Sequence, residues 1–322
     1  MASVPTSPGL SAPCARLFPY WRIARTDHWI KNAFMLPGVA VGLLFLRPPA
    51  MPLVWHVLLG LTSLCLLASA NYTINEYLDA EFDRFHPVKK LRAGALGQLE
   101  PKWVMLQYAG LATAGSALAY IVGVNFALIG AILLLMGIVY NVRPFRTKDR
   151  AYLDVLSESV NNPLRLLLGW FAVVNTGFPP SSTLLAYWMG GCFLMAIKRY
   201  AEFRSINDPE RAGLYRRSFQ FYTEDSLLVS AFFYAICSSF FLAVFLIKYR
   251  IELLLIFPLL SAMFSWYLAI GLKKDSAAQA PEHLFVEGRF LGFVLLIGAV
   301  TFSLFQVSIP PLHILLDPVN IH

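Results

Sequence analysis

Charged residues and cysteines are scarce in this 322-residue chain. Asp, Glu, Lys and Arg make up 14% of it, whereas soluble proteins contain about a quarter charged residues. The four cysteines form no CxxC pair, which gives no support to a disulfide framework or a zinc site. Motifs of the GxSxG, Walker A, dinucleotide-binding and HExxH types are missing as well. Acyl hydrolysis, ATP hydrolysis and nicotinamide chemistry therefore lack their usual residues.

Long apolar runs are what the chain has in abundance. Hydrophobic residues account for 57% of it, and the mean hydropathy is +0.60. The runs are continuous and approach the length of about 20 residues that a helix needs to cross a bilayer, whereas barrel strands would alternate over about ten residues. We therefore predict an all-α polytopic membrane protein with nine transmembrane helices, at residues 33–47, 52–74, 103–122, 124–142, 155–175, 183–201, 226–247, 251–271 and 290–308.

The first 32 residues differ from the rest of the chain. They contain four prolines and several basic residues but no apolar core, so they do not resemble a cleavable signal peptide. We expect residues 1–32 to be a cytosolic basic lead-in and residues 33–322 to form a single transmembrane domain.

Positive charges segregate between alternate loops. The lead-in, the end of the sixth predicted helix and the loops after the second, fourth, sixth and eighth predicted helices hold 22 Lys and Arg residues, whereas the opposite side holds Arg47, Lys248 and Arg250. The positive-inside rule therefore predicts a cytoplasmic N-terminus, cytoplasmic polar clusters and a C-terminus outside. The net charge of +7 follows from this asymmetry and from an anionic lipid or substrate on the inner face, and requires no nucleic-acid partner.

The first polar cluster runs from Asn71 to Gly97, directly after an apolar run. Asn75, Asp79 and Asp83 are spaced by four residues, so a helix would place them on one face, with Glu76 beside Asp79. Such a stack repels itself unless a cation compensates it. Mg²⁺ suits oxygen ligands of this kind, because it accepts one or two protein carboxylates plus substrate phosphates.

The second cluster runs from Tyr140 to Gly169. Asp154, Glu158, Asn162 and Arg165 again share one helical face. Polar groups at membrane depth are costly and normally face an interior cavity. One interpretation is a buried structural ion pair between Glu158 and Arg165; the other is that the two acidic faces form opposing halves of a metal–diphosphate site.

The third cluster, Lys198 to Thr223, holds six cations and no glycine-rich loop. Phosphate would therefore be held by side chains, with Arg binding in a bidentate manner and Lys acting as a point charge. Positive-inside anchoring is the alternative. We favour function for Lys198, Arg199 and Glu202, which alternate with Tyr200 where a lipid phosphate would lie.

The acidic motifs resemble those of a known family. The segment from Asn75 to Asp83 looks like the NDxxDxxxD signature of the UbiA superfamily of intramembrane prenyltransferases, with Glu76 in place of the usual Asp. The run YNVRPFRTK, residues 140–148, is similar to the superfamily's YxxxPxRxK run, and Asp154 to Glu158 is similar to its second motif, DxxxD. The resemblance implies nine helices around a central cavity that opens to the cytoplasmic face.

Three segments look closer to the decaprenyl-phosphate phosphoribosyltransferase branch of that superfamily. They are TDHWIKN from Thr26, where Asp27 replaces the usual proline, HPVKK from His86, and KRYAE from Lys198. This resemblance implies Mg²⁺-dependent transfer of 5-phosphoribose from phosphoribosyl diphosphate to a polyprenyl phosphate, in the bacterial inner membrane. In the other branches a prenyl group passes from prenyl diphosphate to an aromatic acceptor.

The resemblance also implies a set of site residues. Asp79, Asp83, Asp154 and Glu158 are the predicted catalytic residues, and these four with Asn75 and Glu76 are the predicted metal ligands. The predicted substrate-binding residues are Asn75, Lys89, Arg146, Lys148, Asn162, Arg165, Lys198, Arg199, Arg216 and Arg217.

A transporter is the alternative from another class, because intramembrane charges also mark ion pathways. It predicts acidic residues at the midplane of the membrane, whereas the first acidic cluster follows the end of its predicted helix and all clusters lie on one predicted side. The oligomeric state stays open, with a homo-oligomer as one alternative.

Overall fold

The computed structural model describes residues 12–46, 50–174, 176–273, 276–279 and 288–312. These residues form helices without strands. The elements in chain order are α1 (Ala12–Ile23), η1 (Thr26–Met35), α2 (Leu36–Leu46), α3 (Ala50–Leu78), α4 (Ala80–Asp83), η2 (Lys89–Leu91), α5 (Pro101–Val122), α6 (Val124–Asn141), η3 (Thr147–Asp149), α7 (Leu153–Ser159), α8 (Asn161–Phe171), α9 (Ser181–Ile206), α10 (Pro209–Tyr215), η4 (Arg217–Gln220), α11 (Glu224–Tyr249), η5 (Ile251–Ile256), α12 (Phe257–Gly271), η6 (Ala277–Gln279) and α13 (Gly288–Gln306).

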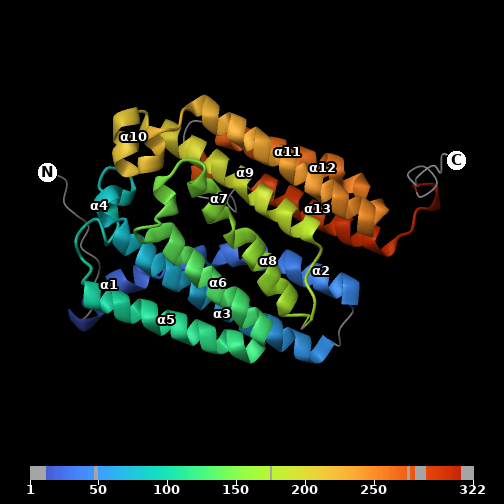
Figure 1. The fold of residues 1–322 in the computed structure, drawn as a ribbon, viewed down its shortest axis with the longest axis horizontal. Coiled ribbons are helices and arrows are strands. Elements are labelled where there is room, and N and C mark those ends of the chain that lie inside the picture. The colour runs from blue at the N-terminus through green and yellow to red at the C-terminus, as the bar shows by residue number, and fades with distance from the viewer. Residues whose placement is uncertain (1–11, 47–49, 175, 274–275, 280–287, 313–322) are drawn as a thin grey trace.

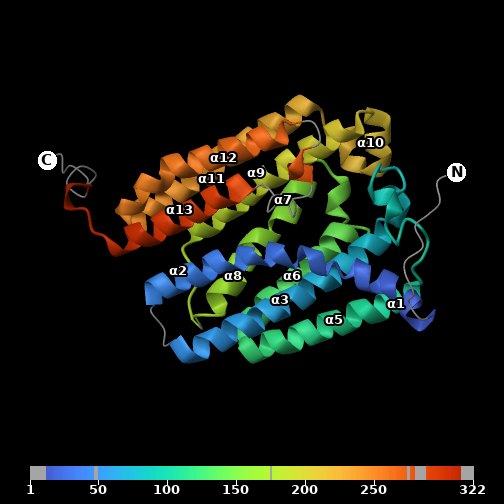
Figure 2. The same ribbon diagram turned by 180° about the vertical axis from the view of Figure 1, so that it is seen from behind.

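The long helices form two groups that lie side by side. One group contains α2, α3, α5, α6 and α8, and the other contains α9, α11, α12 and α13, with α8 packed against α9 between them (Figures 1 and 2). The short elements α4 and α10 lie at one end of the bundle, and the C-terminal end of α13 lies at the other. The polar clusters of the sequence are therefore gathered at one end.

In the part of the chain that the structure describes, six helices are long and apolar enough to cross a membrane, which supports the prediction of an integral membrane protein. They are Leu53–Leu78, Pro101–Val122, Val124–Asn141, Glu224–Tyr249, Ile251–Gly271 and Gly288–Gln306. The other three predicted spans are helical but less regular. The helix α2 has 11 residues, the fifth span is interrupted at Val160 between α7 and α8, and α9 carries charged residues in its last turns. The count of nine and the orientation in the membrane stay predictions.

Several predicted features fall outside the described residues. They are residues 1–11 of the lead-in, Arg47, and the C-terminal residues from 313 onward.

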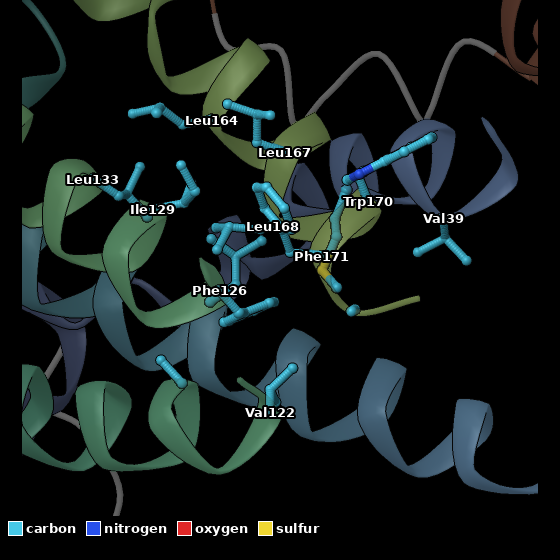
Figure 3. Packing of buried hydrophobic residues seen from close by; sticks show 14 of the residues in the cluster. Val39, Val122, Phe126, Ile129, Leu133, Leu164, Leu167, Leu168, Trp170 and Phe171 are labelled. Atoms are coloured by element: carbon cyan, nitrogen blue, oxygen red, sulfur yellow. The ribbon is translucent and has the colours of Figure 1, made fainter. Parts of the chain in front are cut away.

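The core of the first group is built around α8. Leu168 and Phe171 of α8 pack against Phe126 and Ile129 of α6 (Figure 3). On the other side of α8, glycines bring two backbones together: a Cβ added to Gly169 would lie 2.0 Å from the carbonyl oxygen of Met35. Small residues allow such close packing between membrane helices. This contact holds η1 and α2 tightly against α8.

The predicted metal ligand Glu76 has a different partner in the structure. Its carboxylate accepts a hydrogen bond from Nε of Arg25 at 3.2 Å, and both side chains are largely buried. Arg25 adopts a left-handed backbone conformation with φ 50° where η1 begins. The ion pair therefore fastens the start of η1 to α3, and it directs the Glu76 carboxylate toward Arg25.

Replacing Glu76 by Gln is expected to lower the free energy of unfolding by about 3 kcal/mol, because it leaves the charge of Arg25 without its partner in a poorly hydrated place. Thermal unfolding of the purified protein in detergent would measure this. Glu81→Gln is the matched control, since Glu81 is exposed. Equal melting of the two variants would show that the pair contributes little.

Candidate active site

The first acidic cluster spans a break between two helices. The helix α3 ends at Leu78 and α4 begins at Ala80, so Asp79 lies between them, which corrects the prediction of one continuous helix. Backbone hydrogen bonds still cross the break, from Asp79 to Asn75 at 2.9 Å and from Asp83 to Asp79 at 2.8 Å. Asn75 consequently donates to the Asp79 carboxylate at 3.2 Å, as the spacing predicts, whereas Asp83 pairs with Arg92 at 2.7 Å.

Asp79 is held by the basic run that follows α6. Lys148 donates to its carboxylate, and Nη2 of Arg146 lies 3.1 Å from the same oxygen. Burial by itself would raise the pKa of Asp79, but the charges of Lys148 and Arg146 outweigh it and lower that pKa. Burial also lowers the pKa of Lys148 to about 8.

Asn141, which was not among the predicted site residues, organises this group. Its side-chain oxygen accepts hydrogen bonds from Asn75 at 2.5 Å and from Lys148 at 2.8 Å. Its backbone carbonyl accepts from Arg146 at 3.0 Å. Its position next to Tyr140, where the basic run YNVRPFRTK begins, is the sequence feature that could have identified it. The amide oxygen has two lone pairs and can accept from both donors, while the amide nitrogen donates to the carbonyl oxygen of Gly137 at 2.9 Å.

The second acidic cluster is held together by Arg199. Its guanidinium lies 3.3 Å from Asp154, 2.5 Å from Glu158 and 3.1 Å from Glu202, and Arg199 is 1% exposed. Asp154 is fully buried and also accepts from Ser218 at 3.1 Å and from Tyr222 at 2.8 Å.

These contacts revise two interpretations of the sequence. Arg199 was expected to bind phosphate, but its guanidinium is occupied by three carboxylates. The interpretation of Glu158 and Arg165 as a structural ion pair is wrong, because Glu158 pairs with Arg199 while Arg165 donates to Asn32 at 3.3 Å.

The HPVKK segment is tied to α9 and α10. Lys89 donates to both Glu202 and Tyr215, and Tyr215 donates to Glu202 at 2.8 Å. Nδ1 of His86 accepts hydrogen bonds from the backbone amides of Val88 at 3.1 Å and Lys89 at 3.2 Å. His86 therefore acts as a neutral cap of its own turn.

Acidification is expected to destabilise this turn. Burial, helped by the charge of Lys89, lowers the pKa of His86 from 6.5 to about 4. The unfolded chain therefore binds more protons than the folded one between these values, and stability falls as the pH falls below about 6.5, by about 2 kcal/mol at pH 5. Unfolding measured at pH 7.5 and pH 5 would test this. His86→Asn should show a smaller change, and an equal change in both proteins would contradict the assignment.

A polar pocket lies where these groups meet. Its lining residues belong to α4, η3 and the last residue of α10, or directly adjoin these elements. They are Asp79, Phe82, Asp83, Arg146, Lys148, Asp149, Tyr215 and Arg216. Phe82 and Tyr215 aside, all of these residues are charged. Asp149 and Tyr215 were absent from the predicted site, although Tyr215 directly precedes the Arg216–Arg217 pair.

Several predicted site residues lie elsewhere. Asn162 packs against Gly191, Arg165 lies beside Asn32, and Arg217 is exposed with its guanidinium 5.8 Å from the ring centre of Phe82. The side chain of Lys198 is half-buried on α9.

The predicted six-residue metal set is not gathered in one place. Within the described part of the chain, no three acidic, His or Cys side chains converge on a point that could hold a metal ion. Asp154 and Glu158 are engaged by Arg199, and Glu76 by Arg25. The pocket nevertheless presents the carboxylates of Asp79 and Asp83 beside Arg216. Because Mg²⁺ needs only one or two protein carboxylates when substrate phosphates complete its shell, these residues fit an ion that binds together with a diphosphate.

Comparisons with known proteins identify the family and the fold. Residues 35–312 match the UbiA prenyltransferase family. The chain is 32% identical over 211 residues to the decaprenyl-phosphate phosphoribosyltransferase of Mycolicibacterium smegmatis, which is 64% of this chain and 63% of that one. It is 26% identical over 208 residues to the nodulation protein NoeC of Azorhizobium caulinodans, 62% of each chain. The matches thus span less than two thirds of these curated relatives.

Among solved structures, a UbiA homologue from Archaeoglobus fulgidus bound to DMAPP and Mg²⁺ has a TM-score of 0.68 and 21% identity, covering 90% of this chain and 100% of that chain. At this identity the likeness shows the fold.

Proposed function

From the premise that this chain belongs to the UbiA prenyltransferase family, we propose that it transfers 5-phosphoribose from phosphoribosyl diphosphate to a polyprenyl phosphate and releases diphosphate. The observation that carries this proposal is the lining of the pocket, in which every residue except Phe82 and Tyr215 is charged. A phosphorylated sugar carries polar groups throughout and suits such walls, whereas the hydrocarbon chain of a prenyl donor needs an apolar wall beside the site of its diphosphate. The relatives named as phosphoribosyltransferases support the same choice.

In this proposal the acidic side chains of the pocket bind the metal ion and the basic ones bind the phosphates. Mg²⁺, held by Asp79 and Asp83 together with the donor, would neutralise charge on the departing diphosphate. Arg146, Lys148 and Arg216 line the same pocket and would donate hydrogen bonds to the phosphate oxygens. Asp79 and Asn141 hold the Lys148 ammonium in place through direct hydrogen bonds. This hydrogen-bond donor is therefore oriented before the substrate arrives.

The reaction balances without a general base. The bond between C1 of the ribose and the diphosphate oxygen breaks, and the diphosphate leaves with the electron pair. An oxygen of the polyprenyl phosphate, already ionised near neutral pH, forms the new bond to C1. Positioning and charge neutralisation therefore supply the rate enhancement, as in other phosphate-centred transfers.

Prenyl transfer to an aromatic acceptor is the second candidate. It is favoured by the solved structures of similar fold, which are described as bound to DMAPP or GPP with Mg²⁺. Both reactions would use the same carboxylates and cations, and they differ in which substrate carries the diphosphate.

The test is an assay of purified protein in detergent with Mg²⁺ and phosphoribosyl diphosphate labelled in the ribose. We expect label to enter the lipid phase, and diphosphate to be released, when polyprenyl phosphate is present. Polyprenol, which lacks the phosphate, is the matched control and should give neither. Passage of a prenyl group to an aromatic acceptor, with no ribose label in lipid, would replace this proposal with the second candidate.

The location of the protein is part of the proposal. We place the pocket at the cytoplasmic face of a bacterial inner membrane, with residues 33–322 as one domain. The segregation of positive charges supports this side, and so does the gathering of α4 and α10 at one end of the bundle (Figure 1).

A further inference from the structure

Lys198 lies beside the ion pairs of Arg199 but forms none of them itself. Its neighbour Arg199 contacts three carboxylates, but none of the hydrogen bonds and ion pairs among the described residues includes Lys198. The side chain is half-buried on α9. The charge of Glu158 acts on this ammonium without a hydrogen bond between the two groups, so the ammonium can still donate to an anion that approaches it.

A second lysine lies near it on η1. Tyr187 of α9 donates to the carbonyl oxygen of Phe34 at 3.1 Å, so α9 and η1 are in contact. The segment of η1 and α2 runs antiparallel to α9 (Figures 1 and 2). Lys31 precedes Phe34 and Lys198 follows Tyr187, which puts both on the same side of this contact. The charge of Lys31 acts on Lys198, and the Lys31 ammonium lies 3.0 Å from Nδ1 of His28.

The position of η1 is firmly set by packing. Asn32 is fully buried, donates to the sulfur of Cys65 at 3.2 Å and accepts from Arg165 at 3.3 Å. Trp29 donates to Ser69 at 2.9 Å. Lys31 is therefore presented from a rigid segment, which favours a defined binding role.

Tyr140 and Glu158 separate this pair of lysines from the polar pocket, where the phosphoribosyl donor is proposed to bind and which is called the donor pocket below. On the pocket side, Arg216 donates to the hydroxyl of Tyr140 at 3.3 Å and Lys148 lies 5.8 Å from its ring centre. Tyr140 in turn donates to Glu158 at 2.6 Å, and the charges of Glu158 and Lys198 act on each other. The polar pocket and the pair of lysines are thus adjacent across one tyrosine and one carboxylate.

We propose that Lys31 and Lys198 bind the phosphate of the lipid acceptor, in a subsite next to the donor pocket. This inference rests on the proposed function, which requires two phosphorylated substrates to meet. Lysine binds phosphate as a point charge. Trp29 and Ile30, beside Lys31, are exposed, which favours an anion with an apolar tail over a free phosphate.

Steady-state kinetics provide the first test. Lys198→Gln and Lys31→Gln should each raise the KM for polyprenyl phosphate at least about tenfold, the effect of losing one charged hydrogen bond. The KM for phosphoribosyl diphosphate should stay within about twofold, since it depends on the other subsite. Lys198→Arg should restore most of the acceptor affinity. Lys90→Gln, at an exposed position, is the matched control. An unchanged acceptor KM, or a rise confined to the donor KM, would overturn the inference.

Equilibrium binding separates this inference from the proposed function. Purified protein would be titrated with labelled polyprenyl phosphate in competition with polyprenol or inorganic phosphate. We expect polyprenyl phosphate to bind at least about tenfold more tightly to the wild type than to Lys198→Gln. Should the wild type transfer no ribose phosphate, the proposed function fails while this measurement still decides the inference. Equal binding by wild type and variant, or inorganic phosphate competing as well as the lipid, would refute it.

Discussion

Asp79→Asn is expected to reduce transfer by the folded protein at least about a hundredfold. Asp79 lines the pocket and holds Lys148 and Arg146 with its charge. Asn keeps the shape of the side chain, but it removes a proposed metal ligand and releases two phosphate donors from their positions. Losing one preoriented electrostatic contact typically costs about 10²–10³ in rate.

The measurement is release of diphosphate by purified variant and wild type, with melting in detergent to verify folding. Glu81→Gln is the control, because Glu81 is an exposed acid on the neighbouring α4. A fully active Asp79→Asn protein would show that the pocket is not where transfer occurs.

Asp154 is an acidic residue for which the sequence predicts a catalytic role and the structure indicates a structural one. From the sequence, Asp154→Asn should abolish activity in the same way as Asp79→Asn and leave folding unchanged. In the structure Asp154 is fully buried against Arg199, Ser218 and Tyr222 and does not line the pocket. We therefore expect its replacement to act mainly on stability.

Arg199→Met is expected to be the most destabilising single change in the protein. Arg199 is 1% exposed and lies within ion-pair distance of Asp154, Glu158 and Glu202. Its removal leaves carboxylates buried without their common cation. Breaking one buried ion pair costs about 3–5 kcal/mol, so this variant should lose most of its folded population.

Size-exclusion chromatography and thermal unfolding in detergent would measure that loss. Arg217→Met is the matched control, since Arg217 belongs to the same basic cluster but is exposed. Arg199→Lys should also be destabilised, because an ammonium cannot reach three carboxylates as a guanidinium does. If Arg199→Met folds normally and instead loses phosphate binding, Arg199 is a substrate ligand, as the sequence analysis expected.

Local spacing predicted the parts of the site that depend on one segment alone. Asn75 and Asp79 are brought together by the backbone between them, and their contact was predictable from a spacing of four residues. The contact between Asp83 and Arg92 depends on a loop that returns to the helix, and periodicity carries no information about such a return.

The sequence by itself determined the membrane class, the family and the segments that carry charge, because these depend on composition and on short motifs. Only the tertiary structure decided how the charges pair. Asn71 to Gly97 is the stretch most typical of a diphosphate site, yet its Glu76 faces Arg25 and its Lys89 faces Glu202. Arg199 and Lys198 are adjacent in sequence, but one is enclosed by carboxylates and the other is not. Pairing depends on which helices meet, and the rotation of about 100° between consecutive residues of one helix is enough to give neighbouring side chains different partners.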